Sequence, residues 1–99
     1  MKITVNRTGG YAGITEQLGF MDTANADPKI VAEVTSILKK LEFFNLPSNI
    51  AGEEIGADLQ RYEINISDEN RQHTVNFSEG QNEQTTQLKT LVDIVQHGH

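Results

Sequence analysis

Near its start the chain alternates apolar and polar residues. Ile3 and Val5 are each flanked by polar neighbours, which is the period-two pattern of a strand with one buried face. The pattern predicts a first strand from Lys2 to about Thr8. Three glycines within residues 9–13 then allow the backbone to reverse direction, so we expect a hairpin.

The second strand of this hairpin is less regular than the first. Residues of one parity are apolar apart from a single carboxylate: Ile14, Glu16, Leu18 and Phe20. Because Gly19 interrupts the run and glycine often marks a bulge, we predict a strand that is bulged or twisted near this residue.

The next segment has helical periodicity. Asp27 followed by Pro28 is a helix-start signal, since Asp can cap free amides and proline is tolerated at the first helical position. Apolar residues then recur at helical spacing: Ile30, Val31, Val34, Ile37, Leu38 and Leu41. We predict an amphipathic helix that ends near Leu41 or Glu42. Residues 48–58, with two glycines and three carboxylates, are predicted to form a long loop.

Two further alternating runs, residues 62–66 and 73–77, flank a polar turn and predict a second hairpin. A helical pattern beginning near Asn82 predicts a second amphipathic helix that stops at Gly98. The expected order is ββαββα. It predicts an α+β two-layer sandwich, in which a four-stranded antiparallel sheet of two hairpins has both helices packed on one face.

Composition limits the possible functions. A chain of 99 residues with 36% hydrophobic residues can form one core, so we expect a single domain spanning residues 1–99. It contains no cysteine, which excludes disulfides, Cys-ligated metals and a thiol nucleophile. The acidic net charge of -6 argues against nucleic acid and anionic membranes as partners. We expect the protein to be a monomer when no partner is bound, and to need no cofactor.

Neither a secretion signal nor an apolar run of about 18 residues occurs, so we expect a soluble cytoplasmic protein, with non-classical export as the alternative. Catalytic motifs for metalloproteases, serine hydrolases and P-loop enzymes are also absent from the sequence. His73 is expected at the edge of the core or on the surface of the sheet, while His97 and His99 are expected in the C-terminal tail. A small-molecule enzyme would have to use His73 with Glu63 or Arg61.

The glycine-rich tip of the first hairpin is the most unusual local feature. A tight turn needs one or two glycines, whereas residues 9–13 contain three together with Tyr11 and Ala12. The tip is either an ordinary turn with a surface tyrosine or a slim loop that enters a partner's cleft.

Five segments occur in a family-specific order: RTGGYAG at residues 7–13, FFNLP at 43–47, YEINI at 62–66, HTVNF at 73–77 and LKTLV at 88–92. Together, and over nearly the whole chain, they resemble the emfourin family of small bacterial inhibitors of protealysin-like, thermolysin-type zinc metalloproteases. The length of the acidic segment at residues 48–58 departs from the family's pattern.

The resemblance implies a protein that is not an enzyme and that blocks the active-site cleft of a metalloprotease. It implies a protease-binding surface at the first hairpin: Arg7, Thr8, Gly9, Gly10, Tyr11, Ala12, Gly13 and Ile14. Because carboxylates can ligate zinc, a nearby one could also contact the target's metal ion. The candidates are Glu16, Asp22, Glu53 and Glu54. The alternative is an interaction module that binds a protein through its sheet face or acidic loop without inhibiting a protease.

Overall fold

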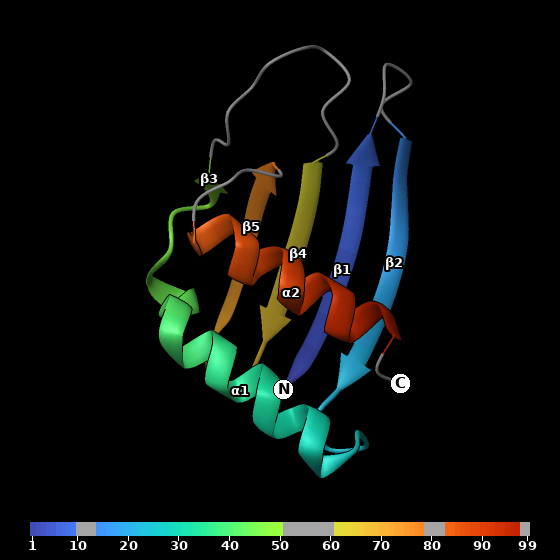
Figure 1. Cartoon of the computed structure of the whole chain (residues 1–99), viewed down its shortest axis with the longest axis vertical. Coiled ribbons are helices and arrows are strands. Elements are labelled where there is room, and N and C mark those ends of the chain that lie inside the picture. The colour runs from blue at the N-terminus through green and yellow to red at the C-terminus, as the bar shows by residue number, and fades with distance from the viewer. Residues whose placement is uncertain (10–13, 51–60, 79–82, 98–99) are drawn as a thin grey trace.

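The computed structural model describes residues 1–9, 14–50, 61–78 and 83–97. In these residues a mixed sheet of five strands carries two α-helices on one face (Figure 1). The elements follow one another as β1 (Lys2–Gly9), β2 (Ile14–Asp22), α1 (Pro28–Leu41), the 3-10 helix η1 (Phe43–Asn45), β3 (Asn49–Ile50), β4 (Arg61–Ser67), β5 (Gln72–Ser78) and α2 (Glu83–His97).

The sheet corrects one expectation. Its strand order is β2-β1-β4-β5-β3, and the four long strands are antiparallel to their neighbours, but β3 runs parallel to β5. The prediction of a four-stranded antiparallel sheet in ββαββα order is therefore wrong. The amide of Asn76 donates to the carbonyl of Ser48 at 2.7 Å, and Ile50 is buried beside Phe77. Strand β3 has only two residues, which are too few to show an alternating pattern in the sequence.

The predicted bulge in β2 is confirmed. Val5 lies opposite Gly19 whereas Asn6 lies opposite Gln17, so Leu18 is the extra residue of the pair. The bulge changes which side chains face the core. Met21, opposite Ile3, is buried, while Phe20 lies on the other face and is 46% exposed. The single parity that we assigned to residues 14–20 is therefore interrupted.

Helix α1 begins and ends where the sequence predicts. The Oδ1 atom of Asp27 accepts a hydrogen bond from the amide of Lys29 at 2.9 Å, and Pro28 occupies the first turn. After Leu41 the chain adopts the left-handed conformation at Glu42, with φ at 50°, which ends the helix. The buried side of the helix consists of Val34, Leu38 and Leu41.

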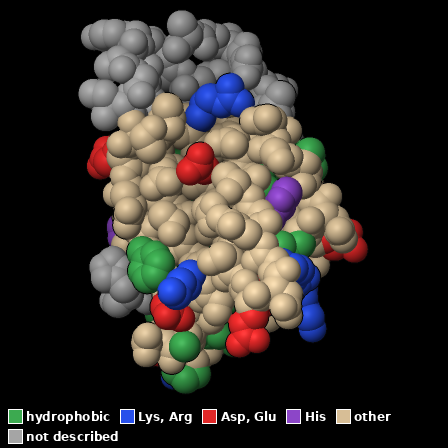
Figure 2. Space-filling model, turned by 180° about the vertical axis from the view of Figure 1, so that it is seen from behind, with side chains coloured by type: hydrophobic (Ala, Val, Ile, Leu, Met, Phe, Trp, Pro, Cys, Tyr) green, Lys and Arg blue, Asp and Glu red, His purple; other side chains and the backbone are tan. Residues whose placement is uncertain are grey.

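The core lies between the sheet and the helices. Helix α2 crosses the sheet over β1 and β2, and α1 packs beside α2 (Figure 1). The fully buried hydrophobic side chains come from the sheet, the two helices and η1: Ile3, Val5, Val34, Phe43, Ile64, Ile66, Val75, Phe77, Leu88, Leu91, Val92 and Val95. The opposite face of the sheet carries mainly side chains that are neither hydrophobic nor charged (Figure 2). Among the described residues, the helices are too short or too polar to cross a membrane.

Candidate functional site

Strand ends from distant parts of the sequence meet along one side of the sheet, an edge formed by the ends of the strands and not by an outer strand. The pairing places Gly9, Ile14, Ile50, Arg61 and Ser78 at this edge, which we call the hairpin edge (Figure 1). Each of these residues directly precedes or follows a segment that lies outside the described residues. Those segments contain several of the predicted site residues: Gly10, Tyr11, Ala12, Gly13, Glu53 and Glu54.

The described part of the first hairpin forms a regular stem that reaches the hairpin edge. Gly9 pairs with Ile14, and the hydroxyls of Thr8 and Thr15 lie 3.3 Å apart on the next pair. One step further, the guanidinium of Arg7 donates to the Glu16 carboxylate at 2.8 Å. The stem thus fixes both ends of residues 10–13.

The charges of the stem are paired but accessible. The Arg7 and Glu16 side chains are 35% and 60% exposed, so their ion pair contributes little to stability, about 0 to 1 kcal/mol. Each of these groups can exchange its partner for a charged group on another protein at small cost. The arrangement suits a contact surface more than a reaction centre, because no histidine adjoins this pair in the described residues.

The two described zinc-ligand candidates lie far apart. Glu16 is on the stem, whereas Asp22 pairs with Lys2 at the opposite end of β2. The two carboxylates lie six positions apart along the strand, a distance of roughly 20 Å. The Oδ1 atom of Asp22 accepts a hydrogen bond from the amide of Ala24 at 3.0 Å, which stabilises the turn after the strand. The two side chains therefore cannot bind one metal ion together.

In the described part of the chain, His73 and the two side chains considered with it for an enzyme lie on different faces of the sheet. His73 lies at the edge of the core, as predicted, with Nε2 at 2.7 Å from the Leu46 carbonyl and its ring against Phe43. Glu63 is on the opposite face of the sheet, where its carboxylate accepts a hydrogen bond from Asn6 at 3.0 Å. Arg61 shares that second face. Among the described residues, no group of three potential metal ligands occurs.

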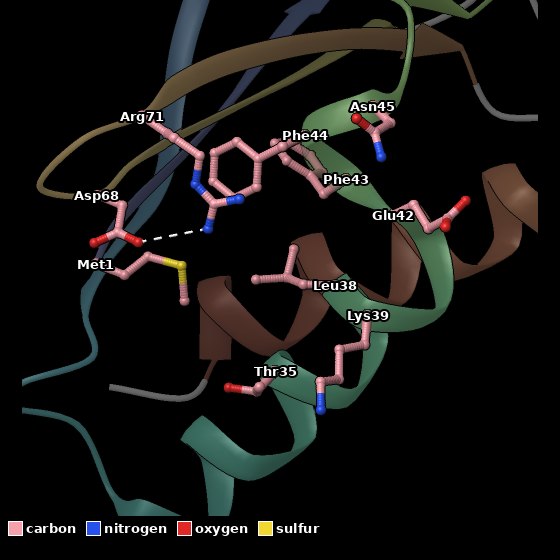
Figure 3. A pocket seen from close by; sticks show the side chains of 10 residues that line it. All are labelled: Met1, Thr35, Leu38, Lys39, Glu42, Phe43, Phe44, Asn45, Asp68 and Arg71. Carbon is pink, nitrogen blue, oxygen red and sulfur yellow. Dashed lines mark ion pairs between the residues drawn. The ribbon is translucent and has the colours of Figure 1, made fainter.

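A groove that the sequence did not predict lies at the other end of the sheet (Figure 3). It has a volume of about 350 Å³, and apolar side chains such as Leu38, Phe43 and Phe44 line it. The guanidinium of Arg71 stacks over the Phe44 ring at 4.0 Å and lies 3.7 Å from the Asp68 carboxylate. The sequence feature that could have indicated this groove is the pair of adjacent aromatic residues at 43–44. Because the groove's charges are balanced, it favours neither anions nor cations.

Comparison with known proteins gives one match. No curated protein and no solved structure is significantly similar to this chain. The family model described as Emfourin, however, matches residues 5–96, which include every described strand and helix at least in part. A match of this extent confirms the resemblance found in the sequence, and the chain belongs to the Emfourin family.

Proposed function

We propose that this protein inhibits a thermolysin-like, protealysin-type zinc metalloprotease by occupying its active-site cleft in competition with substrate. The observation that carries the proposal is the family match over residues 5–96, because membership of the Emfourin family suggests a metalloprotease inhibitor role. An inhibitor of this kind contributes no catalytic group of its own. The catalytic zinc ion belongs to the target.

The first hairpin is the proposed contact surface. It comprises the described stem residues and the tip that the stem holds: Arg7, Thr8, Gly9, Gly10, Tyr11, Ala12, Gly13 and Ile14. The regular pairing of the stem supports this proposal, because a preorganised stem loses less conformational entropy on binding. Because glycine lacks a Cβ atom, a glycine-rich tip would let its backbone approach the floor of a cleft, with Tyr11 as the large anchoring side chain.

A carboxylate near the hairpin edge is the proposed ligand for the target's zinc ion. Glu16 lies two residues from the end of the stem, and its ion pair with Arg7 is exposed. Glu53 and Glu54 belong to the segment bordered by Ile50 and Arg61, which both lie at this edge. Asp22 lies at the other end of β2 and is not part of the proposal.

Initial-rate kinetics test the proposed mode of inhibition. A protealysin-type protease is assayed with a short peptide substrate at several substrate concentrations, with and without the purified protein. Competition predicts a higher apparent KM and an unchanged kcat. A lower kcat with unchanged KM, measured at equilibrium with the protein in large excess over the enzyme, would exclude occupation of the cleft.

The largely polar face of the sheet, opposite the two described helices, favours one alternative, a module that binds another protein without inhibiting a protease. Unchanged KM and kcat at saturating protein would support that alternative and would overturn the proposal.

A further inference from the structure

Strand β2 forms one edge of the sheet and pairs only with β1 among the described strands. Its regular part beyond the bulge at Leu18, residues 19–22, contains neither proline nor lysine. Proteins usually protect such an edge, because its outward backbone N–H and C=O groups can pair with another extended chain. The edge also carries Phe20, which is the large hydrophobic side chain that is exposed among the described residues.

A groove adjoins the C-terminal half of β2. It has a volume of about 510 Å³ and lies where the end of β2, the following turn, the start of α1 and the end of α2 meet. Figure 1 shows these four segments close together, remote from the hairpin edge. The groove is lined by Phe20, Met21, Asp22, Asn25, Ala26, Asp27, Ile30 and His97.

The lining combines apolar surface with carboxylates. Phe20 and Ile30 are partly exposed, and Asp22 and Asp27 supply two negative charges, while neither lysine nor arginine lines the groove. One carboxylate oxygen of each aspartate already accepts a backbone amide, from Ala24 and Lys29 respectively. Their second oxygens are available to accept a hydrogen bond from a cation. Such a lining fits the long apolar stem and charged end of a lysine or arginine side chain.

We propose that β2 binds an extended, basic segment of a partner polypeptide by strand addition, and that a lysine or arginine side chain of this segment enters the groove. Backbone hydrogen bonds along the edge would supply affinity, and the groove would supply preference for a basic side chain. This surface is separate from the proposed protease contact, because it lies at the opposite end of β2.

Charge also decides against a second copy of this chain as the occupant. The charged residues of β2 are Glu16 and Asp22, and the whole chain has a net charge of -6. A second copy would bring the same net negative charge and two further carboxylates to this edge, which opposes self-pairing. A basic segment on the C-terminal half of β2 would instead bring positive charge to Asp22 and Asp27.

Fluorescence anisotropy with the full chain tests the proposal. The probe is a fluorescein-labelled peptide of alternating lysine and valine. Its counterparts are a peptide of alternating glutamate and valine, and the lysine peptide with every second backbone nitrogen methylated. Strand addition predicts binding of the first peptide only, because N-methyl groups remove the donors needed for pairing. Equal binding of the methylated peptide would overturn strand addition, and absence of binding by the lysine peptide would overturn the proposal.

Two variants test the place of binding. Asp22→Asn keeps the acceptor for Ala24 but removes the charge, and Phe20→Thr removes the aromatic ring at a position that suits a β-branched residue. Each should weaken peptide binding about fivefold, equivalent to about 1 kcal/mol. Glu69→Gln removes one exposed charge from the turn after β4 and should change the affinity less than about twofold. Equal weakening by Asp22→Asn and Glu69→Gln would show attraction by net charge alone, against the proposal.

Sedimentation of the protein without peptide tests whether a second copy of this chain occupies the edge of β2. Sedimentation as a monomer at all concentrations agrees with the proposal. A dimer that Phe20→Thr dissociates would place a second copy on β2 and would overturn the choice of a basic partner segment.

Discussion

Gly19 shows how one residue sets the distance between the two layers. A Cβ atom at this position would lie 2.9 Å from the carbonyl oxygen of Val95 and 3.0 Å from the Cα of Gln96, both in the backbone of α2. Backbone cannot move aside as the end of a flexible side chain can. The absence of a side chain therefore lets α2 cross β2 closely, and it explains the interruption that the sequence placed here.

Gly19→Ala should destabilise the protein by about 1–3 kcal/mol, because α2 must shift to accommodate the added methyl group. Urea denaturation followed by circular dichroism measures the change. Gln17→Ala, at an exposed position of the same strand, is the matched control and should change stability by less than about 0.5 kcal/mol. Equal stability of both variants would show that the close approach of α2 to Gly19 is not needed.

Among the residues of the proposed protease contact, we expect Tyr11 to contribute most to the affinity. Tyr11→Ala should weaken inhibition by about 2 kcal/mol, or about thirtyfold, because a central aromatic anchor loses most of its buried surface. Tyr11→Phe keeps the ring and should retain most of the affinity. Inhibition constants for both variants, with melting temperatures as the control for folding, provide the measurement. An unchanged constant for Tyr11→Ala, combined with a loss for a Glu53 and Glu54 double substitution, would move the contact to the acidic segment.

Among the elements, those with a strong period and clear end signals were predictable from the sequence. Helix α1 has an Asp cap, a proline in its first turn and a continuous apolar stripe, and its bounds were predicted correctly. Strand β3 has only two residues, and its pairing depends on a contact with Asn76 far along the chain. The face of Phe20 was also not predictable, because it depends on which residue the bulge leaves unpaired.

The cap of α1 provides a prediction for this element. Asp27→Ala should cost about 1 kcal/mol of stability, since it removes the acceptor for the Lys29 amide. Asp27→Asn retains an oxygen at the same position and should cost less. Thermal unfolding of the two variants measures the difference, and identical melting temperatures for Ala and Asn would show that the hydrogen bond contributes nothing.

For the molecule as a whole, stability should come from packing. The buried apolar residues of the sheet and of both helices form one cluster in the described part of the chain. The sequence contains no cysteine, and no metal-binding group of three ligands occurs among the described residues. Adding a chelator should therefore leave the melting temperature unchanged within error. A fall of several degrees would reveal a structural metal ion.

The candidate site was predictable only in part, and the reason lies in how it is assembled. The hairpin stem is local in sequence, so its two strands could be predicted from residues 2–20. The meeting of Gly9, Ile50 and Ser78 at one edge depends on the strand order, which short-range sequence patterns do not reveal. The grooves beside Phe44 and Phe20 likewise form between elements that are distant along the chain.

Titration of a protealysin-type protease with the purified protein tests the proposed inhibition most directly. Residual cleavage of a small peptide substrate is measured at enzyme concentrations well above the dissociation constant. Tight occupation of the cleft predicts that activity falls in proportion to added protein and is abolished near an equimolar ratio. Full activity in the presence of a large molar excess would contradict the assignment as an inhibitor of this class of protease.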